Sequence, residues 1–310
     1  MSGQSGRAAL WWLTGLALIV APFALGTYHA YLVNLALINI ILAIGLNLLT
    51  GNSGQISLCH SSFMAIGAYG FTLLNNLYHW PVPFAVVAAV LLASIGGYAV
   101  GYPARRLSGI YLALATLAFL ALTQVVIEEF PDLTGGIRGL KIEAMNWFGL
   151  PIDHKYLVYF LLLGCTALGV YAAKQIMDNR LGRAFDAIRT SPQGAQALGI
   201  PVAEIKLTAF VISAAYAGLA GALLSMVVGF IDPVEFGVSA AIRYITFIVI
   251  GGMGSVAGSI AGAVALTGLP EALRPVKEYS DLVYAALLLL SLLFMPNGLV
   301  GLASALRRKP

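Results

Sequence analysis

Long apolar runs separated by short polar connections follow one another along almost the whole of this chain. A segment that crosses a bilayer as a helix needs about 20 mainly apolar residues. Runs of this kind cover residues 8–26, 31–49, 57–75, 83–101, 109–127, 156–173, 206–228 and 281–302. The pattern therefore predicts an all-α fold, a polytopic bundle of membrane helices.

Two places interrupt the apolar pattern with glycine and small polar residues. One lies at Gly51–Ser57, and the other, Gly251–Gly258, divides the apolar region 238–270. The second region can be two spans joined by a tight turn, or a re-entrant element followed by one span. Short or broken helices are expected at both places, because their free backbone groups must face protein or water rather than lipid.

The composition agrees with a membrane protein and excludes several other classes. Hydrophobic residues make up 60% of the chain and charged residues 10%, whereas soluble domains carry about 25% charged residues. The net charge of +4 comes from cations in short loops between apolar runs. This distribution indicates a lipid environment and no nucleic-acid partner. Cys59 and Cys165 lie in or beside apolar segments, which suggests neither a disulfide framework nor a zinc site.

The distribution of lysine and arginine predicts how the chain lies in the membrane. Cytoplasmic loops are rich in these residues, which assigns Arg7, the Arg105–Arg106 pair, the stretch 174–189 and the cations at 307–309 to the cytoplasm. The connection 128–155 mixes both signs and is expected outside. About ten crossings, two of them within 238–270, place both termini in the cytoplasm. A single crossing there would leave the C-terminal cations outside.

Residues 179–204 form a long charged interruption of the apolar pattern. Apolar residues recur there at the spacing of one helical face, namely at Leu181, Ala184, Phe185 and Ile188. Ser191 and Pro192 have the order of a helix N-cap and first residue, and Gly199 is a typical helix stop. We therefore expect a helical hairpin. It is either a passive loop at the membrane interface or a docking element for a soluble partner, and the defined caps favour the second.

Polar side chains beside the two interruptions are candidates for a substrate pathway. They are Asn47, Ser53, Gln55, Ser57 and His60, together with Gly252 and Gly254. The competing interpretation is structural, since a single histidine at helix depth is more often a hydrogen-bonded packing residue. The four-residue spacing of Gly254, Gly258 and Gly262 favours close helix packing over ligand binding. Arg243 is expected to extend toward the outer interface.

Several motifs are missing, and their absence limits the function. The chain has no G-x-x-x-x-G-K-[ST] sequence for binding ATP, and no G-x-S-x-G or H-E-x-x-H motif. We therefore expect no enzyme activity, no metal site and no cofactor bound by this chain. Any ATP and Mg²⁺ must be bound by other polypeptides. An ion-coupled relay also has little support, because no pair of acidic residues lies within an apolar run.

Five ordered stretches resemble a known family. They are "LNLLTGNSGQISLCHSSFMAIGAYG", "RLSGIYLALATLAF", "FPDLTGGIRGL", "GRAFDAIRTSPQGAQALGI" and "IGGMGSVAGSIAGA". Together they resemble the branched-chain amino acid ABC transporter permeases, the LivM-type subunit in particular. The resemblance extends over about residues 31–302 and implies that residues 1–310 form a single transmembrane permease domain.

The resemblance also implies partners and a location. They are a second, LivH-type permease, two ATPase subunits that bind ATP and Mg²⁺, and an external or periplasmic substrate-binding protein, all at a bacterial cytoplasmic (inner) membrane. The family's ATPase-coupling loop corresponds to residues 182–199. The positions that match it are Arg183, Ala184, Asp186, Arg189, Ala197 and Gly199. The wider importer signature begins Glu-Ala-Ala, and this sequence departs from it with Asp186-Ala187-Ile188.

Three other functions remain open at this point. ABC permeases for urea or short amides share these motifs. A secondary transporter would work without ATPases and would carry ion-coordinating acids in broken helices. A passive amide channel would give flux that does not depend on ATP.

Overall fold

The structure is a computed structural model that describes residues 26–147, 150–151, 155–269 and 279–294, with the isolated residues 22, 298, 299 and 301. Most of the predicted first span, residues 8–26, lies outside the described residues. The same holds for the cations at positions 307–309 and for the end of the last predicted span.

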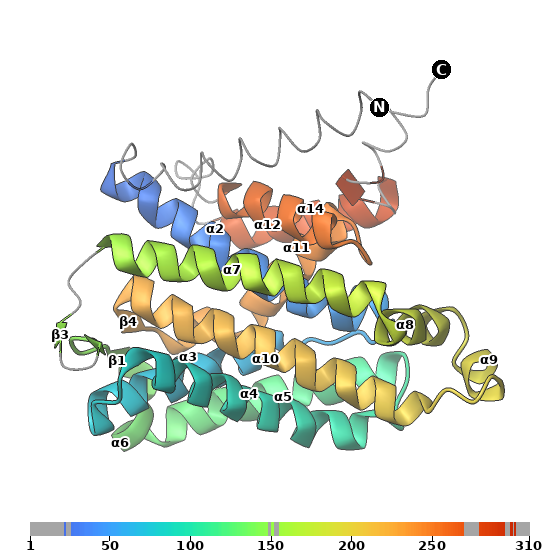
Figure 1. Ribbon diagram of the computed structural model, residues 1–310, viewed down its shortest axis with the longest axis horizontal. Helices are drawn as coiled ribbons and strands as arrows, with labels where there is room; N and C mark the ends of the chain where they lie inside the picture. Colours follow the sequence, from blue (N-terminus) through green and yellow to red (C-terminus); the bar gives the residue numbers. More distant parts are fainter. Residues whose placement is uncertain are drawn as a thin grey trace.

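The described residues form a helical bundle (Figure 1). The longer helices are α2 (Thr27–Leu46), α3 (His60–Tyr78), α4 (Val82–Ala104), α5 (Ile110–Glu129), α7 (Lys155–Asp178) and α10 (Val202–Val228). Shorter ones are α8 (Arg180–Thr190), α9 (Pro192–Ala197), α11 (Val238–Gly251), α12 (Val256–Thr267) and α14 (Ser280–Phe294). A π-helix, η1 (Asn47–Asn52), continues α2. The all-α expectation is thus confirmed for the membrane-type helices.

Small elements complete the connections at one end of the bundle. They are α6 (Pro131–Thr134), the 3₁₀ helices η2 (Gly136–Arg138) and η3 (Pro233–Phe236), and four two-residue strands. Strand β1 (Leu140–Lys141) pairs antiparallel with β4 (Phe230–Ile231), and β2 (Asn146–Trp147) pairs antiparallel with β3 (Leu150–Pro151). The β1–β4 pair ties the connection that follows α5 to the chain that leaves α10.

Five helical segments in the described part of the chain are long and apolar enough to cross a membrane: 27–52, 82–104, 110–129, 156–178 and 202–228. The region 238–270 instead forms two short helices, α11 of 14 residues and α12 of 12 residues. At 1.5 Å per residue they are about 21 Å and 18 Å long, less than the hydrocarbon thickness of about 30 Å. The predicted break at Gly251–Gly258 is confirmed, and the two helices are joined by a tight turn.

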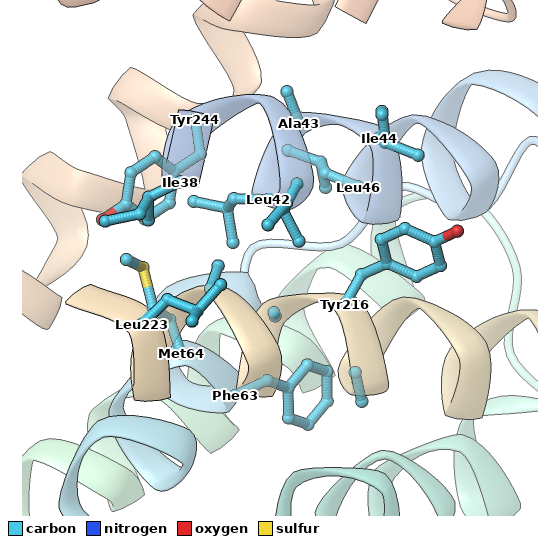
Figure 2. Close-up of a cluster of buried hydrophobic side chains, with 14 of the residues drawn as sticks. Ile38, Leu42, Ala43, Ile44, Leu46, Phe63, Met64, Tyr216, Leu223 and Tyr244 are labelled. Atoms are coloured by element: carbon cyan, nitrogen blue, oxygen red, sulfur yellow. The ribbon is translucent and has the colours of Figure 1, made fainter. Parts of the chain in front are cut away.

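Helices α2 and α10 lie at the centre of the bundle. Buried residues make up 67% of the apolar window in 27–52 and 61% of that in α10, against 22–28% in α4, α5 and α7. The outer helices therefore present most of their apolar surface outward, as expected in lipid. Figure 2 shows how the core is filled: Ile38 and Leu42 of α2 point toward Met64 of α3 and Leu223 of α10.

Glycine brings α3 and α10 close together. A Cβ added at Gly67 of α3 would collide with the backbone of Gly218 in α10, and one added at Gly221 would collide with the carbonyl of Met64. Small residues permit this approach where lipid supplies no hydrophobic drive for helix association. Any side chain at either position would force the two central helices apart.

The two ends of the bundle differ in character (Figure 1). Helices α8 and α9 extend beyond the long helices at one end, whereas α6, β1, β3 and β4 lie at the other. The charged segment 179–204 and the connection after α5 are therefore at opposite ends. This arrangement is what the charge distribution predicts for loops on opposite sides of a membrane.

Candidate functional site

The two interruptions of the apolar pattern lie against each other in the fold. Asn47 in η1 donates through Nδ2 to the Ser255 carbonyl at 2.9 Å and to Ser259 Oγ at 2.7 Å. Its Oδ1 accepts from the Gly254 amide at 2.8 Å, and Asn52 donates to the Gly254 carbonyl at 3.2 Å. We call residues 47–57 and 252–259 the junction. Polar side chains of one broken helix thus satisfy the free backbone groups of the other.

The π-helix follows from local hydrogen bonds at its end. The Ser53 amide donates to the Leu48 carbonyl, five residues back, at 3.2 Å, and Ser53 Oγ donates to the Leu49 carbonyl at 2.7 Å. Gly54 then takes a φ of +72°, which ends the helix. Single π-turns of this kind often occur at functional sites.

The same segment also contacts the start of α10. Gln55 donates from Nε2 to Ser53 Oγ at 2.8 Å and to the Lys206 carbonyl at 3.3 Å. Thr50 fixes the turn by donating to the Gln55 carbonyl at 3.1 Å. Lys206 lies two residues after segment 179–204, so Gln55 contacts the helix that begins where that segment ends.

His60 joins three helices. Ser213 of α10 donates its one hydroxyl proton to the Gly45 carbonyl of α2 at 2.7 Å. Ser213 Oγ must therefore accept the short hydrogen bond that it shares with His60, whose Nε2 carries the proton. The other ring nitrogen, Nδ1, shares a hydrogen bond of 3.3 Å with Ser57 Oγ. His60 is thus a packing residue with both ring nitrogens used. Ser57 lies in the segment before α3.

The predicted glycine series needs one correction. Gly258 and Gly262 of α12 pack against the backbone of α11 at Gly251 and Phe247, as expected for close helix packing. Gly254 is not part of this helical face. It lies in the turn between the helices with a φ of +81°, a conformation that residues with a Cβ rarely adopt.

The polar side chains among the candidate pathway residues are all buried. Exposed fractions of Asn47, Ser53, Gln55, Ser57 and His60 are 1–2%. All five form hydrogen bonds within the chain, and Gln55 Oε1 is a buried oxygen without a partner. Their arrangement holds α2, α3, α10 and the α11–α12 pair in register.

The segment 179–204, which we call the docking hairpin after the role predicted for it, has a buried base and an exposed tip. Phe185 and Ile188 of α8 are buried. The predicted caps are confirmed, because Ser191 Oγ accepts from the Gly194 amide at 3.1 Å, and Gly199 ends the second helix with a φ of +79°. The predicted coupling residues divide accordingly: Ala184 is half-buried, whereas the others are exposed, namely Arg183, Asp186, Arg189, Ala197 and Gly199.

Two features of the docking hairpin were not predicted from the sequence. Leu198 at the tip is 81% exposed. Arg189 lies over the junction. A Cβ added at Gly54 would lie 3.3 Å from the Arg189 Cα, and one added at Gly254 would lie 2.7 Å from its Nη1. Arg189 thus connects the docking hairpin to both broken segments.

Replacing Asn47 with alanine is expected to destabilise the permease by about 1–2 kcal/mol, because the Gly254 amide and the Ser255 carbonyl lose a buried partner. Equilibrium unfolding of the purified protein in detergent measures this change. Gln193→Ala, at an exposed position of α9, is the control and should leave stability unchanged. Equal stability of the two variants would show that the junction contributes little.

In the part of the chain that the structure describes, no group of three His, Cys, Asp or Glu side chains could hold a metal ion. The polar residues of the site serve to connect helices.

Comparison with known proteins gives the biological context. The family described as "Branched-chain amino acid transport system / permease component" matches residues 28–292.

The chain belongs to this permease family. It is 33% identical to the branched-chain amino acid permease LivM of Escherichia coli K12, over 97% of this chain and 76% of that protein. Its identity to LivH of the same strain is 31%, over 84% of this chain and 90% of LivH. The autoinducer 2 import permease LsrC of E. coli is 31% identical over 76% of this chain and 70% of LsrC. No solved structure gives a significant match.

The family match confirms the resemblance found in the sequence, and the LivM match covers more of the chain than the LivH match. The chain is a permease component of a branched-chain amino acid ABC transport system, and thus a multi-pass transport subunit rather than an enzyme. Membership of an ABC system implies that ATPases act on separate subunits.

Proposed function

We propose that this chain is the LivM-type subunit of an ATP-driven importer that carries branched-chain, hydrophobic amino acids across a bacterial inner membrane. Two separate ATPases bind ATP and Mg²⁺, and a LivH-type permease completes the membrane part. An external binding protein delivers the substrate. About ten crossings with both termini in the cytoplasm complete this proposal.

The observation that carries the proposal is the docking hairpin. Its base, α8, packs against η1, α7 and α10. It exposes Arg183 and Asp186 on the outer side of α8 and the apolar Leu198 at the tip. A passive tether needs neither two defined helices with a capped junction between them nor an exposed apolar tip. A soluble partner that binds the tip can instead push against a firmly packed base.

The contacts of the base indicate how such a push acts on the membrane part. Arg189 lies on Gly54 and Gly254, and the Lys206 carbonyl accepts from Gln55. A displacement of the hairpin therefore reaches η1 and the turn between α11 and α12 together. In the proposed mechanism, closure of the ATPases moves the hairpin, the junction rearranges, and the permease pair switches between inward- and outward-facing states. The candidate pathway residues become accessible only during this change.

Reconstituted uptake tests the proposal. The full complex in proteoliposomes should accumulate leucine, isoleucine and valine when Mg-ATP and the binding protein are present, and should fail with a non-hydrolysable ATP analogue. Autoinducer 2 is one competing substrate, since a permease that imports it is 31% identical to part of this chain. Urea is the other, because the sequence resemblance alone leaves an ABC permease for urea open. Uptake that persists without ATP would instead indicate a secondary transporter or a channel.

A further inference from the structure

A cavity of about 360 Å³ opens at the end of the bundle opposite the docking hairpin. It lies between α2, α3, α10 and the segment that joins α10 to α11. Its apolar walls include Leu35, Leu224, Ile231 and Phe236. Its volume falls at the lower end of the range of small-molecule sites, about 300–1,000 Å³. A free amino acid, smaller than most such ligands, fits a site of this size.

The cavity carries negative charge. Asp232 and Glu235 line it, and the residues that line it include no lysine or arginine. Asp232 is held in place because its Oδ1 accepts from the Val234 amide at 2.9 Å and caps η3. Tyr31 of α2 adds a phenol hydroxyl to the lining. A ligand with a positive group at one end and an aliphatic body complements this lining.

A cation lies directly behind the second acid. Arg243 of α11 donates through Nη2 to Glu235 Oε2 at 3.1 Å. Their side chains are 28% and 64% exposed, respectively, and exposed ion pairs of this kind contribute only about 0–1 kcal/mol. A ligand that brings both an ammonium and a carboxylate can therefore replace this pair with two new ones at little cost.

We propose that this cavity is an entry site for the free, zwitterionic amino acid, an inference that rests on the function proposed above. The α-ammonium binds the carboxylates of Asp232 and Glu235, and the aliphatic side chain packs against Leu35, Leu224 and Ile231. The α-carboxylate takes the place of Glu235 on Arg243. The site lies at the end where a binding protein would release its cargo, far from the junction.

Leucine binding to the complete transporter in nanodiscs tests this assignment. The nanodiscs contain phosphatidylcholine only, and the binding protein is omitted. Asp232→Asn keeps the capping oxygen and Glu235→Gln keeps the shape, so both variants should fold. Each is expected to weaken leucine binding roughly tenfold or more, because a charge-assisted hydrogen bond is lost. Glu143→Gln, at an exposed acid outside the cavity, is the control and should bind as the wild type does. Unchanged binding in both cavity variants would overturn the assignment.

A lipid ammonium is the alternative source of the same chemistry. Mass spectrometry of the transporter purified from membranes with phosphatidylethanolamine separates the two. If Asp232→Asn and Glu235→Gln lose bound phosphatidylethanolamine but bind leucine normally, the cavity is a lipid site and the proposal is wrong. 4-Methylpentanoate, which lacks the ammonium, should not compete with leucine for binding. If it competed as well as unlabelled leucine does, that result would also contradict the proposal.

Uptake by the wild-type complex separates this inference from the proposed function. If wild-type proteoliposomes import leucine and the two cavity variants import and bind it equally well, only the entry site is refuted. If wild-type proteoliposomes import no branched-chain amino acid, the proposed function itself fails.

Discussion

Replacing Arg189 with alanine is expected to uncouple ATP hydrolysis from transport while the ATPases remain bound. The side chain lies on Gly54 and next to Gly254, so its loss leaves a gap between the docking hairpin and the junction. Coupling free energies between distant sites are typically 1–3 kcal/mol, or about 5–150-fold. We expect leucine uptake per ATP hydrolysed to decrease by a factor of about 5–150. The measurement uses proteoliposomes that contain the whole complex.

Two variants make this prediction specific. Arg180→Ala removes the same charge from the same helix, at an exposed position, and should transport normally. The double replacement of Arg183 and Arg189 should also weaken ATPase association, since Arg183 is exposed on the outer side of α8. If Arg189→Ala alone released the ATPases, Arg189 would be a docking residue, as the family resemblance implies. If both Arg183 and Arg189 could be replaced with transport and association intact, the docking hypothesis would be refuted.

Replacing Leu198 with aspartate is expected to weaken ATPase binding by about 10- to 150-fold. Leu198 is 81% exposed at the tip of the hairpin, and burying a leucine side chain in an interface contributes about 1.5–3 kcal/mol. Aspartate removes that contribution and introduces a charge that the interface must desolvate. Co-purification of the ATPases with the permease, titrated with detergent-solubilised ATPase, measures the loss.

Leu133→Asp is the matched control for the tip. Leu133 is 51% exposed on α6, at the opposite end of the bundle, so the same change there should leave ATPase binding intact. Equal losses from both variants would indicate a general effect on folding. No loss from Leu198→Asp would exclude the tip as a contact.

The sequence predicted those features that depend on residues near one another in the chain. The caps of the docking hairpin were correct because Ser191 bonds to an amide only three residues away. The breaks near Gly51 and Gly251 were visible because glycine and hydroxyl residues interrupt apolar runs there. Most helix positions followed from apolar run length, since lipid requires each crossing helix to satisfy its own backbone.

Features that depend on distant pairing could not be predicted from the sequence. The Asn47–Gly254 hydrogen bond joins residues 207 positions apart, and no local pattern indicates that the two breaks meet. The contact of Arg189 with the junction could not be predicted either, because an arginine at this position is equally suited to binding a soluble partner. Gly254 was assigned to a helical face because its spacing to Gly258 is four, and only its φ of +81° reveals the turn.

The cavity lined by Asp232 and Glu235 could not be predicted from the sequence either. Asp232 and Glu235 stand in a short connection that has no recognisable motif. They form a candidate site only in the fold, where apolar residues of α2 and α10 line the cavity beside them and Arg243 of α11 pairs with Glu235. The sequence predicted that Arg243 would extend to an interface but contained no signal for its partner.

Site-specific photocross-linking in membranes of the intact complex tests the central claim most directly. A photoreactive residue at position 198, on the tip of the docking hairpin, should form an adduct with an ATPase subunit. The same photoreactive residue placed at position 234 should form no ATPase adduct. Val234 is 77% exposed and lies at the opposite end of the bundle. An ATPase adduct from position 234 but not from position 198 would contradict the account, because it would place the source of energy at the wrong end of the permease.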